Sequence, residues 1–126
     1  MFVIRNNIIP LDGFEALTVW PFIFVRSKNF DAVDENHERI HASQQFEILI
    51  VGIVMAVVLS VSGCEWWSLF ALPIFFYWYL LEWSVRLVFL PGNAYRKTSF
   101  EAEAYAHQED MDYLRNRKPF AWIKYL

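Results

Sequence analysis

The chain has 126 residues, of which 56% are hydrophobic and 19% aromatic, a high apolar content for a soluble domain of this size. The length predicts one domain, residues 1–126, and the single cysteine excludes an internal disulfide framework. The net charge of −3 gives no reason to expect a nucleic-acid partner.

Residues 1–30 are predicted to form strands and turns. Leu11-Asp12-Gly13 is a turn signal, and residues 14–25 are rich in aromatic and β-branched side chains. Pro21 lacks the N–H that a central strand needs, so this run is expected to be an edge strand or two short strands. Such an edge could pair with an extended peptide.

A long helix is predicted over residues 34–63. Asp31 or Asp34 is expected to cap its start, where acidic side chains are favoured by the helix dipole. Nothing breaks the pattern before Gly63. The helix therefore runs from a polar segment straight into an apolar one.

The start of this helix contains His37-Glu38-Arg39-Ile40-His41, which has the form H-E-x-x-H. Positions i and i+4 of a helix share one face, so both imidazoles can bind one metal ion. Glu38 then lies close enough to take a proton from a water molecule held by that metal, which makes it the candidate catalytic residue. Gln44 continues the metal-facing side as a candidate neighbour of the ligands.

Chance is the alternative explanation for this motif. Exposed polar helices contain His and Glu without binding metal, and isolated matches in large sequence sets are often empty. The residues around the motif are therefore needed to decide between the two interpretations.

Two apolar segments follow. Residues 48–64 have no charged side chain, and residues 66–90 have only Glu82 and Arg86. About 20 apolar residues suffice for a helix to cross the ~30 Å hydrocarbon layer, so both segments are predicted to span the membrane as a helical hairpin. The alternative is a buried hairpin in a soluble protein, but so short a chain has little polar surface left to cover it.

Basic residues predict the orientation of this hairpin. They precede it at Arg5, Arg26, Lys28 and Arg39, and follow it at Arg96, Lys97, Arg115, Arg117, Lys118 and Lys124. The turn between the two apolar segments has none. By the positive-inside rule both termini are expected in the cytoplasm, which places the segments before and after the hairpin on the same side of the bilayer.

Glu82 and Arg86 lie four residues apart inside the second predicted span, where charges are costly unless paired. A self-neutralising pair is the simpler interpretation, and a partnership of Arg86 with substrate or with a site carboxylate is the alternative.

A third metal ligand is expected from a helix predicted over residues 98–114, because two histidines do not complete a catalytic zinc site. Its candidates are Glu101, Glu103 and His107. Thr98 and Glu101 have the spacing of a capping box, in which case Glu103 becomes the ligand, with His107 on the same face. Spacing alone therefore does not decide whether Glu101 or Glu103 is the third ligand.

The two motifs and the apolar segments between them resemble a known family. H-E-x-x-H followed, after membrane helices, by E-x-x-A-[DY] is similar to the gluzincin-like membrane metallopeptidases of the zincin class, which include the prenyl-protein and heat-shock membrane proteases. The second motif here is Glu101-Ala102-Glu103-Ala104-Tyr105. The resemblance implies that Glu101 is the ligand and that Tyr105 stands where many relatives have an Asp in contact with a histidine. It covers the two motifs and the hairpin, not the first 30 residues.

The sequence therefore predicts a mainly α membrane protein with a short N-terminal β segment, a transmembrane hairpin, a cytoplasmic C-terminal helix and a zincin-like site at the membrane interface. We expect a zinc metallopeptidase that acts on peptides or proteins, with zinc held by His37, His41 and Glu101. Two rivals remain: a non-catalytic zinc protein with the same ligands, and a metal-free hairpin subunit of a larger membrane complex. Homo-oligomerisation is compatible with all three, because so short a chain has little material for a closed cleft.

Overall fold

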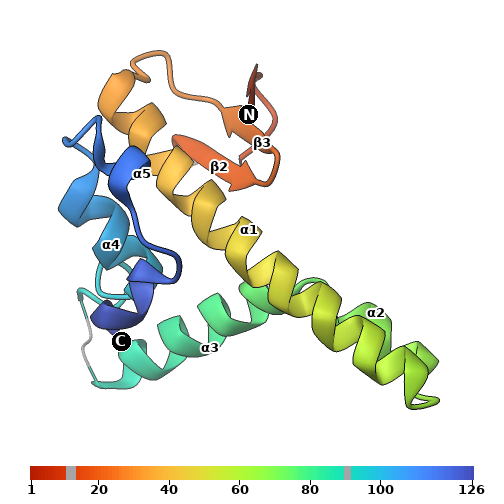
Figure 1. Cartoon of the computed structure of the whole chain (residues 1–126). Coiled ribbons are helices and arrows are strands. Elements are labelled where there is room, and N and C mark those ends of the chain that lie inside the picture. The colour runs from red at the N-terminus through yellow and green to blue at the C-terminus, as the bar shows by residue number, and fades with distance from the viewer. Residues whose placement is uncertain (11–13, 90–91) are drawn as a thin grey trace.

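The computed structural model describes residues 1–10, 14–89 and 92–126. They form a mainly helical protein with one short sheet near the N-terminus (Figure 1). The predicted turn at residues 11–13 and Leu90, the last residue of the second predicted span, lie outside these residues.

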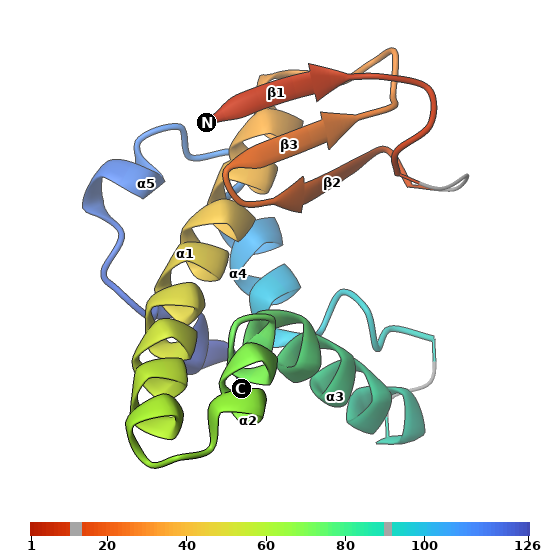
Figure 2. The ribbon, with the colours of Figure 1, turned by 90° about the vertical axis from the view of Figure 1, so that its right-hand side faces the viewer.

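The sheet has three strands, β1 (Phe2–Arg5), β2 (Ala16–Val19) and β3 (Phe22–Val25). Their order is β1-β3-β2, with β1 parallel and β2 antiparallel to β3. The Trp20–Pro21 peptide bond is cis and joins β2 to β3. The prediction of two short strands separated by Pro21 is therefore confirmed, and β2 lies at one edge of the sheet, against the first long helix (Figure 2).

That helix, α1 (Ala32–Val61), is unbroken for 30 residues. Both predicted caps take part in its start, because the Asp31 carboxylate accepts from the Asp34 N–H while the Asp34 carboxylate accepts from the Asp31 N–H. Gly63, at φ +79°, takes the left-handed conformation just beyond its end. The prediction of one helix over residues 34–63 is confirmed to within two residues at each end.

The second predicted span is two helices, α2 (Glu65–Ala71) and α3 (Ile74–Phe89), which are bent by 61° at the break between them. Pro73 lies at this break, where its ring and missing N–H prevent a continuous helix. The second predicted span is therefore not one continuous helix. α2 packs along the end of α1, and a Cβ on Gly52 would lie 2.5 Å from the Ala71 carbonyl oxygen, so this contact requires glycine.

Among the described residues, α1 is the one helix long and apolar enough to cross a membrane, with a mean hydropathy of 2.0 over its best window. A second membrane span is present only if the bent pair α2–α3 is counted as a single span. The coarser prediction of a helical protein with a membrane-compatible helix is supported, whereas the transmembrane hairpin is not confirmed.

The C-terminal region consists of α4 (Ser99–His107), α5 (Tyr113–Asn116) and the 3₁₀ helix η1 (Ala121–Tyr125). The helix predicted over residues 98–114 therefore ends early, at His107. Past that point the Asp110 side chain accepts from the Asp112 N–H at 3.1 Å, and such local bonds of Asp compete with helical ones.

A small apolar core joins α1, α3, α4 and η1. It consists of Ile48, Phe75, Phe100 and Trp122. Trp122 is 7% exposed, and its ring lies 4.8 Å from that of Phe100. This packing fixes α4 beside the first half of α1, with the sheet on the other side (Figure 1).

Glu82 of α3 fixes the start of α4. Its carboxylate accepts from the Ser99 N–H at 2.7 Å and from the Ser99 hydroxyl at 2.6 Å, and it pairs with Arg86 at 2.8 Å. Arg86 also donates to the Tyr125 carbonyl. The self-neutralising pair is thus present, and Arg86 serves the packing of α3 against the C-terminal segment.

Candidate metal centre

His37, His41 and Glu101 form a cluster at the contact between α1 and α4. The two Nε2 atoms are 3.0 Å apart, and each lies 3.4 Å from one oxygen of the Glu101 carboxylate. Tetrahedral ligation at ~2.0–2.1 Å separates neighbouring ligand atoms by about 3.3 Å. The three side chains are 12%, 10% and 3% exposed. The spacing and the burial therefore fit one metal ion.

Gln44 determines which nitrogen of His41 carries the proton. Its amide nitrogen donates to the Phe100 carbonyl at 3.0 Å and to Glu103 at 2.9 Å, so its oxygen must face His41. That oxygen lies 2.8 Å from His41 Nδ1. The Nδ1–H therefore donates to Gln44 and leaves the Nε2 lone pair directed into the cluster.

Gln108 has the same relation to His37, since its Oε1 lies 2.9 Å from His37 Nδ1. Asn36 holds the backbone here by donating to the carbonyls of His107, Gln108 and Asp110, which lie at or just beyond the end of α4. Both imidazoles thus present lone pairs to each other and to a carboxylate, an arrangement that requires a cation or an added proton between them.

Glu101 is the third member of the cluster. Its Oε1 accepts from the Tyr79 hydroxyl at 3.1 Å, while its Oε2 is buried without a hydrogen-bond partner among the described residues. Burial acts to raise the pKa of Glu101, but the positive charge of the added proton on His41 and the hydrogen bonds from both imidazoles outweigh it and hold that pKa below its usual range. Glu101 is therefore an ionised carboxylate with one oxygen free for a metal.

Glu101 and Glu103, the two candidates for the third ligand, occupy different positions relative to the histidines. Glu101 turns toward the histidines, and the capping box with Thr98 is not formed because the Thr98 hydroxyl donates to the Tyr95 carbonyl. Glu103 lies on the other side of Gln44, where it accepts two hydrogen bonds from Arg117 at 2.7 and 3.1 Å.

Glu103 supports the ligands from behind. Its side chain is completely buried and accepts from Gln44, Tyr113 and Arg117. Burial raises the pKa of Glu103, but these bonds outweigh it and lower the pKa overall. Arg117 also pairs with Glu47 of α1. A chain of hydrogen bonds therefore runs from Arg117 through Glu103 and Gln44 to His41.

Glu38 lies on the sheet side of the cluster. The Thr18 hydroxyl of β2 donates to its carboxylate at 2.6 Å. Thr18 is 4% exposed, so this contact holds the Glu38 side chain in place beside His41.

Tyr105 lies beside the ligand His37, as expected of a close neighbour, whereas His107 does not contact a ligand. The Tyr105 ring packs edge-on against His37 at 4.7 Å, under the Arg96 guanidinium, so Gln108 and not Tyr105 accepts from His37. His107 lies outside the cluster, stacked on Tyr113 and 2.9 Å from the Tyr125 hydroxyl.

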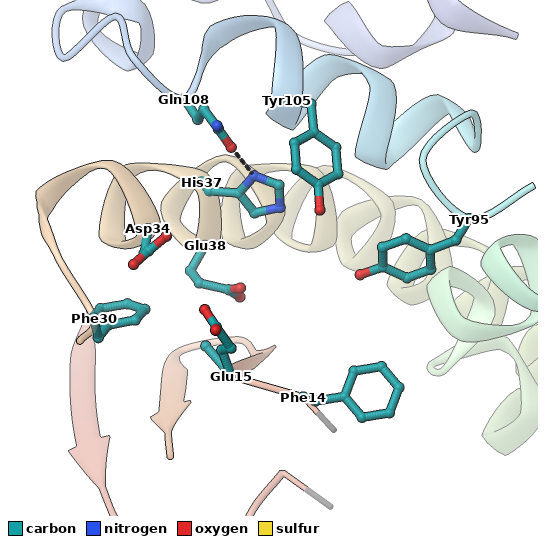
Figure 3. A pocket seen from close by; sticks show the side chains of 10 residues that line it. Phe14, Glu15, Phe30, Asp34, His37, Glu38, Tyr95, Tyr105 and Gln108 are labelled. Atoms are coloured by element: carbon teal, nitrogen blue, oxygen red, sulfur yellow. Dashed lines mark hydrogen bonds between the residues drawn. The ribbon is translucent and has the colours of Figure 1, made fainter. Parts of the chain in front are cut away.

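Two adjoining cavities flank the cluster, each of about 350 Å³. One is lined by polar side chains, and in it Glu38, Tyr95 and Tyr105 point toward the open space (Figure 3). The other borders Glu38, His41 and Glu101 and is mostly aromatic. The cluster is therefore accessible from a cleft between β2 and the helices α3 and α4.

Comparisons with models of protein families, with curated proteins and with solved structures found no match for this chain. The site is thus interpreted from its own geometry.

Sequence reasoning missed Thr18, Tyr79, Gln108 and Arg117. Gln108 follows Glu101 by seven residues, two helical turns. This spacing places the two residues on the same face of a helix and could have predicted that Gln108 lies near the cluster. The other three come from elements whose packing against α1 no local pattern specifies.

Proposed function

We propose that this chain is a zinc-dependent metallopeptidase whose site lies at the membrane surface. The observation that carries the proposal is the convergence of two imidazole Nε2 atoms and one carboxylate, beside Glu38 and open to a cleft. Two histidines and one carboxylate are a ligand set typical of catalytic zinc, which keeps a position open for water or substrate.

His37, His41 and Glu101 would hold the metal. When bound, zinc would supply a Lewis acid that lowers the pKa of a water molecule and polarises the carbonyl under attack.

Glu38 would act as general base and then as general acid. Its carboxylate would accept a proton as the water oxygen bonds to the carbonyl carbon, and would pass that proton to the amine nitrogen as the C–N bond breaks. The Thr18 hydroxyl would keep the carboxylate in position. The Tyr95 and Tyr105 hydroxyls, which point into the cavity (Figure 3), would donate to the negative charge on the carbonyl oxygen.

The edge of β2 would bind the substrate by strand addition, since it borders both cavities. We place the apolar part of α1 in the bilayer, with both termini in the cytoplasm, so that the site faces the cytoplasmic membrane surface.

The first test is the zinc content of detergent-purified protein, wild type beside His41→Ala. We expect about one zinc per chain in the wild type and its loss in the variant. Absence of zinc from wild-type protein purified without chelators would contradict the metal site and favour the metal-free hairpin subunit.

The second test separates catalysis from structural metal binding. Glu38→Gln should keep zinc and lose hydrolysis of an unfolded protein substrate by roughly 10²–10⁴-fold. Glu35→Gln, which removes an exposed carboxylate paired with Arg39, is the control and should keep full activity. Full activity of Glu38→Gln would overturn the general-base role, and zinc without any hydrolysis in the wild type would favour the structural-zinc rival.

A further inference from the structure

Gln45 occupies part of the outer edge of β2. Its amide nitrogen donates to the Thr18 carbonyl at 2.7 Å, and its amide oxygen accepts from the Trp20 N–H at 2.8 Å. The Gln45 side chain is 8% exposed. It therefore forms the two bonds that one residue of a parallel added strand would form at this point.

Strand alternation shows which part of the edge stays open. Thr18 and Trp20 direct backbone groups outward, whereas the Glu15 carbonyl accepts from the Arg26 N–H on the β3 side. Ala16 therefore also faces outward, and it borders both cavities of the cleft. An added strand finds backbone partners at Ala16, next to the cluster, and meets Gln45 beyond Thr18.

The aromatic cavity begins where this edge is closed. Phe75, Phe76, Tyr79 and Trp83 of α3 line it, together with Leu17 and Gln45. Its volume of about 350 Å³ accommodates a large apolar side chain, and it adjoins His41 and Glu101. A peptide that cannot continue along β2 therefore has an apolar cavity into which its next side chain can turn.

We propose that the substrate has a large apolar residue at a fixed distance from the scissile bond, seated in this aromatic cavity, and that Gln45 is a positioning residue that ends strand pairing there. The substrate class is a polypeptide with a large apolar side chain near the bond that is cut. This inference rests on the proposed peptidase function.

The experiment uses zinc-loaded full-length protein and a series of Ser–Gly peptides in which one Phe is moved stepwise. Products are identified by mass spectrometry. We expect the cut bond to follow the Phe at a constant offset, with kcat/KM about tenfold above that of a peptide without Phe. Cut bonds that ignore the position of the Phe would overturn the proposal while leaving the peptidase function standing.

Phe76→Ala is the matching variant, because Phe76 lines the cavity and is 45% exposed, which limits any effect on folding. It should remove most of the tenfold preference. Tyr77→Ala, at a neighbouring residue that is 49% exposed and absent from the cavity lining, should keep the preference. Equal loss in both variants would contradict the assignment of the cavity.

Gln45→Ala tests the positioning role by the spread of products. With the edge free beyond Thr18, several neighbouring bonds should be cut where the wild type cuts one, which a merely structural defect would not cause. A single unchanged cut bond would overturn this role.

A binding measurement separates failure of the pocket from failure of catalysis. Dye-labelled Phe peptide should bind Glu38→Gln protein about tenfold more tightly than the peptide without Phe, and Phe76→Ala in that background should abolish the difference. Selective binding without hydrolysis in the wild type would refute the peptidase and retain the pocket; equal binding of the two peptides would refute the pocket.

Discussion

The two halves of α1 have opposite relations to their surroundings. In the first half, polar side chains are buried, as in Asn36, His41, Gln44 and Gln45. In the second half, apolar side chains are exposed, and Val54 and Val61 have 58% and 81% of their surface free. One continuous helix thus joins a segment with buried polar side chains to a segment with exposed apolar side chains.

This difference indicates two kinds of stabilisation along one helix. Buried polar groups persist only when their hydrogen bonds are satisfied, and in the first half the partners come from β2 and α4. Exposed valines and isoleucines need a non-aqueous solvent, which a bilayer supplies. Under the proposed membrane placement, the site lies where α1 passes from one environment to the other.

Removing the charge of Glu103 should have the largest effect on the polar half. Glu103→Gln leaves the Arg117 side chain, 4% exposed, with a weakened partner, and breaking a buried ion pair costs about 3–5 kcal/mol. Thermal unfolding in detergent, followed by circular dichroism, measures the loss. Glu109→Gln, on an exposed position of the same segment, is the control, and equal stability of the two variants would show that the buried network contributes little.

A charge in the apolar half should disturb the membrane and not the site. Val54→Lys places an ammonium near the middle of the exposed apolar segment, at a cost of about 2.5–3.5 kcal/mol for insertion. We expect a smaller fraction of the protein in membranes after alkaline carbonate extraction. Met111→Lys adds the same charge at an exposed residue outside the helices and should change nothing; full retention of Val54→Lys in the membrane would argue against a bilayer around this half.

The smallest expected effect is on zinc affinity and comes from Gln44, which joins the buried hydrogen-bond network to His41. Gln44→Leu removes the acceptor of His41 Nδ1 and should weaken zinc affinity by about 10–100-fold, as for other residues that orient metal ligands. Competition with a chromophoric chelator measures the affinity. Gln45→Leu leaves His41 untouched and should bind zinc as the wild type does, so an equal loss in both variants would indicate general destabilisation.

Predictions made from local patterns agree best with the structure where one rule dominated. Asp31 and Asp34 marked the start of α1, and Pro21 marked the division of a strand run in two. Pro73 carried the same kind of signal, but the apolar composition around it favoured one span over residues 66–90, and the chain there forms two helices bent by 61°. Composition indicates the environment of a segment and not its continuity.

The sequence by itself determined that His37 and His41 share one face of α1, because their i, i+4 spacing follows from the helix alone. Only the tertiary structure decided between Glu101 and Glu103. These residues lie about 200° apart around α4, and both contact α1, Glu101 at the two histidines and Glu103 at Gln44. Which carboxylate reaches the histidines depends on how α4 is rotated. That rotation is set by the packing of Phe100 against Phe75 and Trp122, contacts between segments far apart in the chain that no local pattern encodes.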